Sequence, residues 1–154
     1  MKKLKVQILL FLGFCLLTAC NEKTVYSEYE SIAVEGWARN DTIAFNDIVI
    51  KATTDYKEEI GVRINDAFPF LGLFLYVEQE IRPGHIIRTD TLSCRLMDEE
   101  GNVKGRGLSF YQYNFHLTTL HLYAGDTLSI RIRHNMRRET LPGVANIGMR
   151  ISKQ

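Results

Sequence analysis

Residues 127–133 read TLSIRIR, and this stretch decides the fold class of the 154-residue chain. Leu128, Ile130 and Ile132 alternate with polar residues. Successive side chains of a β-strand point to opposite faces, so a strict alternation of this kind predicts a strand with one buried face. Gly125-Asp126 supplies a turn before it, and residues 147–151 repeat the same apolar alternation.

Further strands are predicted outward from this stretch, separated by residues typical of turns. Residues 71–77 are apolar at nearly every position, which predicts a strand buried on both faces. A short helix is a candidate only at 135–140. The other predicted strands lie at 41–50, 60–64, 86–97 and 108–123, with two strands in the last range. Seven to nine short strands predict an all-β fold, a single antiparallel β-sandwich over residues 32–154, either Ig-like or jelly-roll-like.

The amino-terminal residues have the features of a lipoprotein signal peptide. A basic start, MKKLK, precedes an apolar stretch at 6–17 that is shorter than the roughly 20 residues needed to span a bilayer. Residues 17–20 read LTAC, a lipobox in which the Cys20 thiol accepts a diacylglycerol and its amino group a further acyl chain such as palmitate. We therefore expect residues 1–19 to be removed and residues 20–31 to form a lipidated tether. The alternative is an ordinary signal peptide with a chance cysteine.

Chain length, charge and cysteine count limit the classes of function that the chain can have. Cleavage before Cys20 leaves 135 residues, enough for one domain, with two more acidic than basic side chains. Nucleic-acid binding needs a concentrated basic surface, so no such partner is predicted. Cys94 would be the last free thiol, in an apolar alternation that predicts a buried side chain. No disulfide, metal site or cofactor is predicted, and no catalytic residue pattern occurs.

One aromatic row leaves two interpretations open. Tyr111, Tyr113 and Phe115 share one face of a predicted strand. An exposed flat row could stack against sugar rings, whereas a buried row fills a core. We favour the core for this row and for Trp37, the only tryptophan.

Arginines give the candidate binding residues. Arg131, Arg133 and Arg150 lie on the polar faces of two late strands, with Arg137 and Arg138 just beyond the first. If these strands pair, the sandwich carries a basic patch for a partner, for which we select Arg131, Arg133, Arg137 and Arg150. The alternative is a solvated face with mixed ion pairs.

The carboxy-terminal third carries a family resemblance. Met136-Arg137 follows a strand, and residues 141–151 then read LPGVANIGMRI. Together they resemble the GldH family of gliding-motility lipoproteins of the Bacteroidota. Upstream, DTL at 90–92, DEEG at 98–101 and GRG at 105–107 are similar to the family's D-T-L, D-x-x-G and G-x-G elements.

The resemblance covers nearly the whole mature chain, with Trp37 at a position where an early tryptophan is common. His134 stands where the family usually has glutamine, and Asn146 where it has aspartate. The resemblance implies a non-enzymatic component of, or accessory to, the envelope machinery for gliding and the associated type IX secretion. It implies partners among the envelope proteins of that machinery and brings no catalytic residues.

The expected location is the cell envelope, with the membrane as one partner through the lipid anchor. Asn21 after Cys20 is not the aspartate that retains lipoproteins in the inner membrane, and no acidic run follows closely. We therefore expect the periplasmic side of the outer membrane rather than the inner membrane. The rival function is a glycan- or small-ligand-binding envelope lipoprotein, which an exposed aromatic row would favour.

Overall fold

The computed structural model describes residues 23–154, and these form ten β-strands and no helix. The strands are β1 (Thr24–Ser31), β2 (Trp37–Ala38), β3 (Ile43–Val49), β4 (Thr54–Asn65), β5 (Gly72–Arg82), β6 (Ile86–Arg95), β7 (Phe110–Leu122), β8 (Thr127–His134), β9 (Thr140–Leu141) and β10 (Val144–Lys153). The predicted signal peptide and Cys20 lie outside the described residues. Across 23–154 there is no helix with the length and apolar character to cross a membrane.

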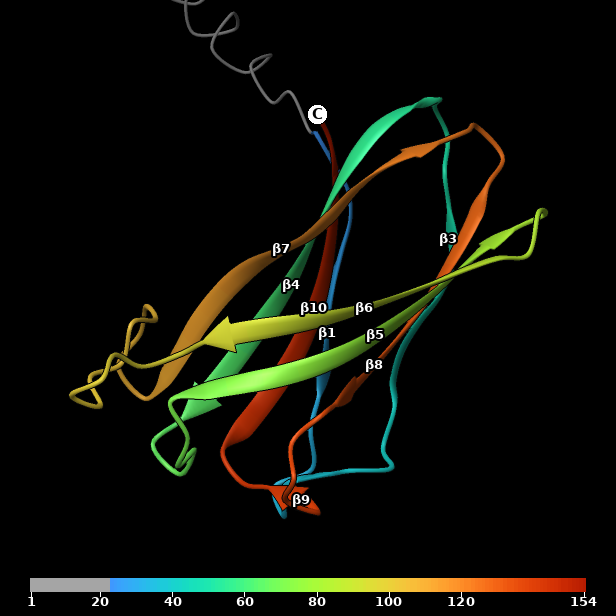
Figure 1. The fold of residues 1–154 in the computed structure, drawn as a ribbon. Helices are drawn as coiled ribbons and strands as arrows, with labels where there is room; N and C mark the ends of the chain where they lie inside the picture. The colour runs from blue at the N-terminus through green and yellow to red at the C-terminus, as the bar shows by residue number, and fades with distance from the viewer. Residues whose placement is uncertain (1–22) are drawn as a thin grey trace, which may run out of the picture.

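The long strands form two antiparallel sheets that face each other (Figure 1). The first sheet has the order β1-β10-β4-β7 and the second sheet the order β3-β8-β5-β6, while β2 and β9 pair separately. Along the chain the long strands cross between the sheets at nearly every step, and the first and last strands lie side by side. This is a jelly-roll arrangement, so the predicted antiparallel sandwich is confirmed and the Ig-like alternative is set aside.

The core lies between the sheets and follows the alternation in the sequence. Leu128, Ile130 and Ile132 on β8 are fully buried, and so are Ile147, Met149 and Ile151 on β10. Burial of such a side chain contributes about 1.5–3 kcal/mol to stability. The predicted burial of Trp37 and Cys94 is also confirmed.

The predicted tether at residues 20–31 is wrong from Thr24 onward. Thr24–Ser31 form β1, the edge strand that pairs with β10. The polar residues face water, while Tyr26 lies edge-on against Phe45 with ring centroids 6.2 Å apart. The sandwich domain therefore begins at Thr24 rather than at residue 32, because an edge strand with one exposed face needs few apolar residues.

Three local predictions also fail. Residues 71–77 are buried on one face only: Phe74 is 47% exposed, because no further layer formed by residues 23–154 covers the outer face of the second sheet. Residues 108–123 hold one long strand, β7, with a register irregularity opposite Glu58 and Glu59. Residues 135–140, the candidate for a short helix, contain none: bends at 137–139 lead into β9, which begins at Thr140.

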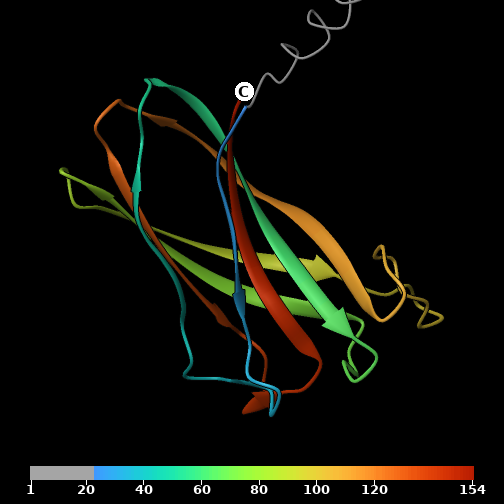
Figure 2. The same ribbon diagram turned by 180° about the vertical axis from the view of Figure 1, so that it is seen from behind.

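The two ends of the sandwich differ in what they contain (Figures 1 and 2). At the terminal end, the Lys153 N–H donates to the Lys23 carbonyl at 2.7 Å, which places the start of β1 beside the end of the chain. At the opposite end, here called the β9 end, Trp37 of β2 pairs with Leu141 of β9. Strand β1 connects the two, and eight residues at roughly 3.3 Å each span about 26 Å.

Candidate partner-binding site

The predicted arginine patch is divided by the strand order. Strands β8 and β10 lie in different sheets and do not pair. Arg131 and Arg133 are exposed on the outer face of the second sheet, whereas Arg150 is exposed on the outer face of the first. The four selected arginines therefore do not form one surface. Arg137 lies between β8 and β9, at the β9 end.

Three of these arginines interact within the chain. Arg131 Nη1 lies 3.3 Å from Glu78 Oε1 on β5, an exposed ion pair. The Arg133 guanidinium carbon lies 4.5 Å from the ring centroid of Tyr76, a cation–π contact. Arg150 donates to Thr24 Oγ1 of β1 at 3.0 and 3.3 Å. The solvated face with local pairs thus describes these positions better than an open basic patch.

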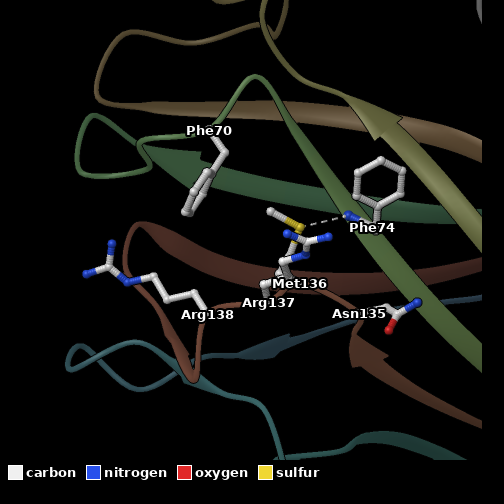
Figure 3. A pocket seen from close by; sticks show the side chains of 6 residues that line it. All are labelled: Phe70, Phe74, Asn135, Met136, Arg137 and Arg138. Carbon is white, nitrogen blue, oxygen red and sulfur yellow. Dashed lines mark hydrogen bonds between the residues drawn. The ribbon is translucent and has the colours of Figure 1, made fainter.

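Arg137 instead belongs to a pocket of about 650 Å³ at the β9 end, which we call the β9-end pocket. Its lining residues come from the loop before β5, from β5 itself and from the segment after β8: Phe70, Phe74, Asn135, Met136, Arg137 and Arg138. Figure 3 shows the Met136 side chain between the rings of Phe70 and Phe74. The pocket combines an apolar floor with two guanidinium groups.

Hydrogen bonds hold the floor of the pocket in place. The Asn135 N–H donates to the Phe74 carbonyl at 2.7 Å, which extends the β5–β8 ladder by one step. The Phe74 N–H in turn lies 3.5 Å from Met136 Sδ (Figure 3). The segment after β8 is therefore fixed against the start of β5, and Met136 cannot leave without freeing a backbone donor.

His134 supports this segment from the core side. It is 2% exposed and lies edge-on against Trp37, with ring centroids 5.3 Å apart. Its Nδ1 lies 3.4 Å from the Met136 N–H, a weak contact in which a neutral ring accepts. Burial lowers the pKa of His134 below its usual value, which favours that neutral ring.

Arg137 and Arg138 are exposed, and neither has an ion-pair partner among residues 23–154. The nearest acid along the chain, Glu139, pairs with Arg39 at 3.1 Å. No lining residue carries a carboxylate or a nucleophile. The pocket can therefore bind a group that presents an apolar part and a negative charge, since guanidinium groups pair well with carboxylates.

The aromatic row is mostly internal. Tyr113 is 8% exposed, and its hydroxyl donates to the Leu96 carbonyl at 2.7 Å. Phe115 stacks on Tyr113 at 5.9 Å, and both Tyr111 and Phe115 are partly buried against the core. The predicted core role is confirmed, so Tyr111, Tyr113 and Phe115 do not form a flat exposed row.

Known proteins identify the family. The model of the family described as GldH lipoprotein matches residues 24–151. The chain belongs to the GldH lipoprotein family. The GldH match begins at the first residue of β1, so the family unit coincides with the complete sandwich.

Two GldH relatives align over nearly their whole length. "Gliding motility lipoprotein GldH" of Flavobacterium johnsoniae is 25% identical over 159 residues, with 99% of each chain covered. "Gliding motility lipoprotein GldH homolog" of Christiangramia forsetii is 28% identical over 152 residues, covering 90% of this chain and 89% of the relative. Among solved structures, a family 35 carbohydrate binding module from Clostridium thermocellum has 15% identity and a TM-score of 0.40, covering 77% of this chain and 76% of the module.

Sequence reasoning found part of the β9-end pocket. It selected Arg137, and the GldH resemblance drew attention to Met136-Arg137. It missed Phe74, assigned to a strand buried on both faces, and Phe70. The sequence held no clear signal for Phe74, because Leu73, Phe74 and Leu75 are all apolar and the pattern does not show which face of the strand is covered.

Proposed function

We propose that this GldH-family chain is a lipid-anchored, non-enzymatic component of, or accessory to, the envelope machinery for gliding motility and the associated type IX secretion. Family membership and relatives named as gliding motility lipoproteins support the motility role. The lipobox ending at Cys20 supports attachment to a membrane by lipid. Asn21 and the lack of a nearby acidic run support the periplasmic side of the outer membrane.

The β9-end pocket carries the proposed assembly role. Anchorage at Cys20 would hold the terminal end, where β1 starts, nearest the membrane. The pocket lies at the opposite end, roughly the length of β1 away, with two arginines that no acid in residues 23–154 balances. An anchored domain would thus present its uncompensated charge and apolar side chains away from its own membrane, where another envelope protein can reach them.

Gentle crosslinking in the organism that encodes the chain tests this proposal. A tag after Gln154 lies at the terminal end and leaves the pocket uncovered. We expect gliding or type IX secretion components to be recovered with the tagged protein. Recovery should fall in the Arg137→Glu, Arg138→Glu double variant and persist in Arg150→Glu, whose arginine lies on the other sheet. A preparation that contains none of these components would contradict the assembly role.

A further inference from the structure

The β9-end pocket has the features of a peptide-binding site. We propose that it binds a short segment of a partner protein in which one large apolar side chain is flanked by aspartate or glutamate. The inference rests on the proposed function only in taking the partner to be an envelope protein. Its chemistry comes from the pocket alone.

The apolar part of the ligand follows from the pocket floor. Phe70, Phe74 and Met136 line a volume of about 650 Å³, which falls within the range of roughly 300–1,000 Å³ that small-molecule pockets occupy. Phe74 is 47% exposed, so part of this floor is open to a ligand. Aromatic and methionine side chains are enriched where proteins bind each other, and methionine adapts its shape to different ligands. A phenylalanine, leucine or methionine side chain of the partner therefore suits the floor.

The acidic part of the ligand follows from the charge of the rim. Arg137 and Arg138 have no ion-pair partner in residues 23–154, while Glu139 is held by Arg39. Carboxylates on either side of the apolar anchor would meet these guanidinium groups, which form bidentate pairs.

A protein segment fits the position of the pocket better than a lipid headgroup. The start of β1 and the chain end lie together at the terminal end, and β9 lies at the opposite end (Figure 1). The pocket includes Arg137 and Arg138, which directly precede β9. A membrane that held the chain through residues before β1 would lie about 26 Å or more from the pocket.

Fluorescence anisotropy with the full-length lipoprotein in detergent tests the inference. The probe is a labelled synthetic peptide with one phenylalanine between two pairs of glutamates. We expect saturable binding that weakens with salt, and at least about tenfold weaker binding when alanine replaces the phenylalanine or lysines replace the glutamates.

Variants of the chain locate the binding. Arg137→Glu with Arg138→Glu, and separately Phe74→Ser, should each weaken binding of the glutamate peptide at least about tenfold. Arg150→Glu is the matched control and should bind as the unaltered chain does. Arg137→Lys with Arg138→Lys keeps the charge and should retain part of the affinity, which separates a local effect from a failure to fold.

Three outcomes would overturn the inference. They are no binding of the peptide by the unaltered chain up to about 1 mM, equal binding by the double glutamate variant, and tighter binding to phosphatidylglycerol vesicles that is lost in the same variants. The last would make the ligand a lipid surface. Recovery of machinery components by crosslinking alongside any of these results would keep the proposed function and remove only this peptide ligand.

Discussion

The outer face of the first sheet and the β9-end pocket use the same residue types in opposite ways. On the first sheet, the Arg63 guanidinium carbon lies 4.3 Å from the ring centroid of Tyr29. Arg63 Nε donates to Gln112 Oε1 at 3.1 Å, and Gln112 Nε2 donates to the Tyr29 hydroxyl at 3.1 Å. These three side chains satisfy one another across β1, β4 and β7.

Two glycines allow this closed arrangement. Gly61 on β4 and Gly148 on β10 are register partners, and the Tyr29 ring lies over both. A Cβ at Gly148 would lie 2.6 Å from Tyr29 Cε1, and one at Gly61 would meet the Tyr29 hydroxyl. A strand glycine here permits close approach of an aromatic ring.

The β9-end pocket has no such closure. Its arginines have neither a carboxylate nor a stacked ring among residues 23–154, and Phe74 remains half exposed. Where an arginine stacks on an aromatic ring of the same surface, as Arg63 does on Tyr29, the two groups satisfy each other without a partner. Where both are left open at one place, the surface keeps groups that another molecule can contact, which is why the peptide is proposed there and not on the first sheet.

The largest effect we expect is a pH dependence of stability caused by a polar pair buried between the two sheets. Gln79 Nε2 of β5 donates to Glu58 Oε2 of β4 at 2.9 Å, so one polar pair joins the sheets. Glu58 Oε1 and Gln79 Oε1 are buried without a partner among residues 23–154. A proton on Glu58 would supply the donor that these oxygens lack. Burial raises the pKa of Glu58 from 4.5 to about 7; Asp90 acts in the same direction, and the Gln79 bond and Arg88 oppose it.

The sign of the resulting pH dependence follows from linkage. Below pH 4.5 the carboxyl is protonated in both folded and unfolded chains, so the stabilisation is complete. Between pH 4.5 and about 7 only the folded chain keeps the proton, and stability falls as pH rises, by about 3 kcal/mol in all.

Urea unfolding of the unaltered chain and Glu58→Gln across pH 4.5–8 measures this difference. The Glu58→Gln variant should lack the fall in stability between pH 4.5 and about 7. The lowered pKa of His134 makes stability rise with pH below about pH 6.5, and it does so equally in both proteins. Parallel pH profiles for the two proteins would show that Glu58 is ionised in the folded chain.

A smaller effect is expected from breaking the closed face. Gly148→Val should lower the free energy of unfolding by about 2 kcal/mol, because the new side chain displaces the Tyr29 ring. In a Tyr29→Ala background the same substitution should cost little, since the space is then free. A double-mutant cycle by chemical denaturation checks this coupling. Equal costs in both backgrounds would mean that the ring does not constrain the glycine.

The smallest changes in stability are expected when one arginine from each region is replaced by alanine. Arg63→Ala should cost about 1 kcal/mol, from a cation–π contact and a hydrogen bond. Arg137→Ala should change stability by less than about 0.5 kcal/mol, because this arginine makes no ion pair in residues 23–154. Thermal unfolding of the two variants side by side measures the contrast. A cost for Arg137→Ala as large as that for Arg63→Ala would erase the distinction between the two regions.

The alternation of apolar residues predicted most of the sandwich, because period-2 patterning is a local property. It held for β8 and β10, where one face is fully buried. It was also present but unused at Glu58, which lies in step with Tyr56 and Ile60 and is therefore buried. It failed at Phe74, where apolar residues occupy both faces of a strand although only one face is covered.

Local sequence patterns could not predict which site residues the fold brings together. Arg133 and Arg150 lie on strands that are close in sequence, yet the jelly-roll order puts β4 beside β10 and β5 beside β8. That order depends on long-range packing, which no short segment encodes. The pocket likewise joins Phe70 and Phe74 to Met136 across more than 60 residues, through the contact between Phe74 N–H and Met136 Sδ.

The position of β1 has a mechanical consequence. Its first residue lies at the terminal end, and it runs antiparallel to β10 through seven registered pairs toward the β9 end. A pull at Lys23, resisted by a partner held at the β9 end, would act along the strand axis. The ladder hydrogen bonds are perpendicular to that axis, so they would share the tension in shear instead of opening one after another. An edge strand that resists tension in this way suits a domain that is held at one end and loaded at the other.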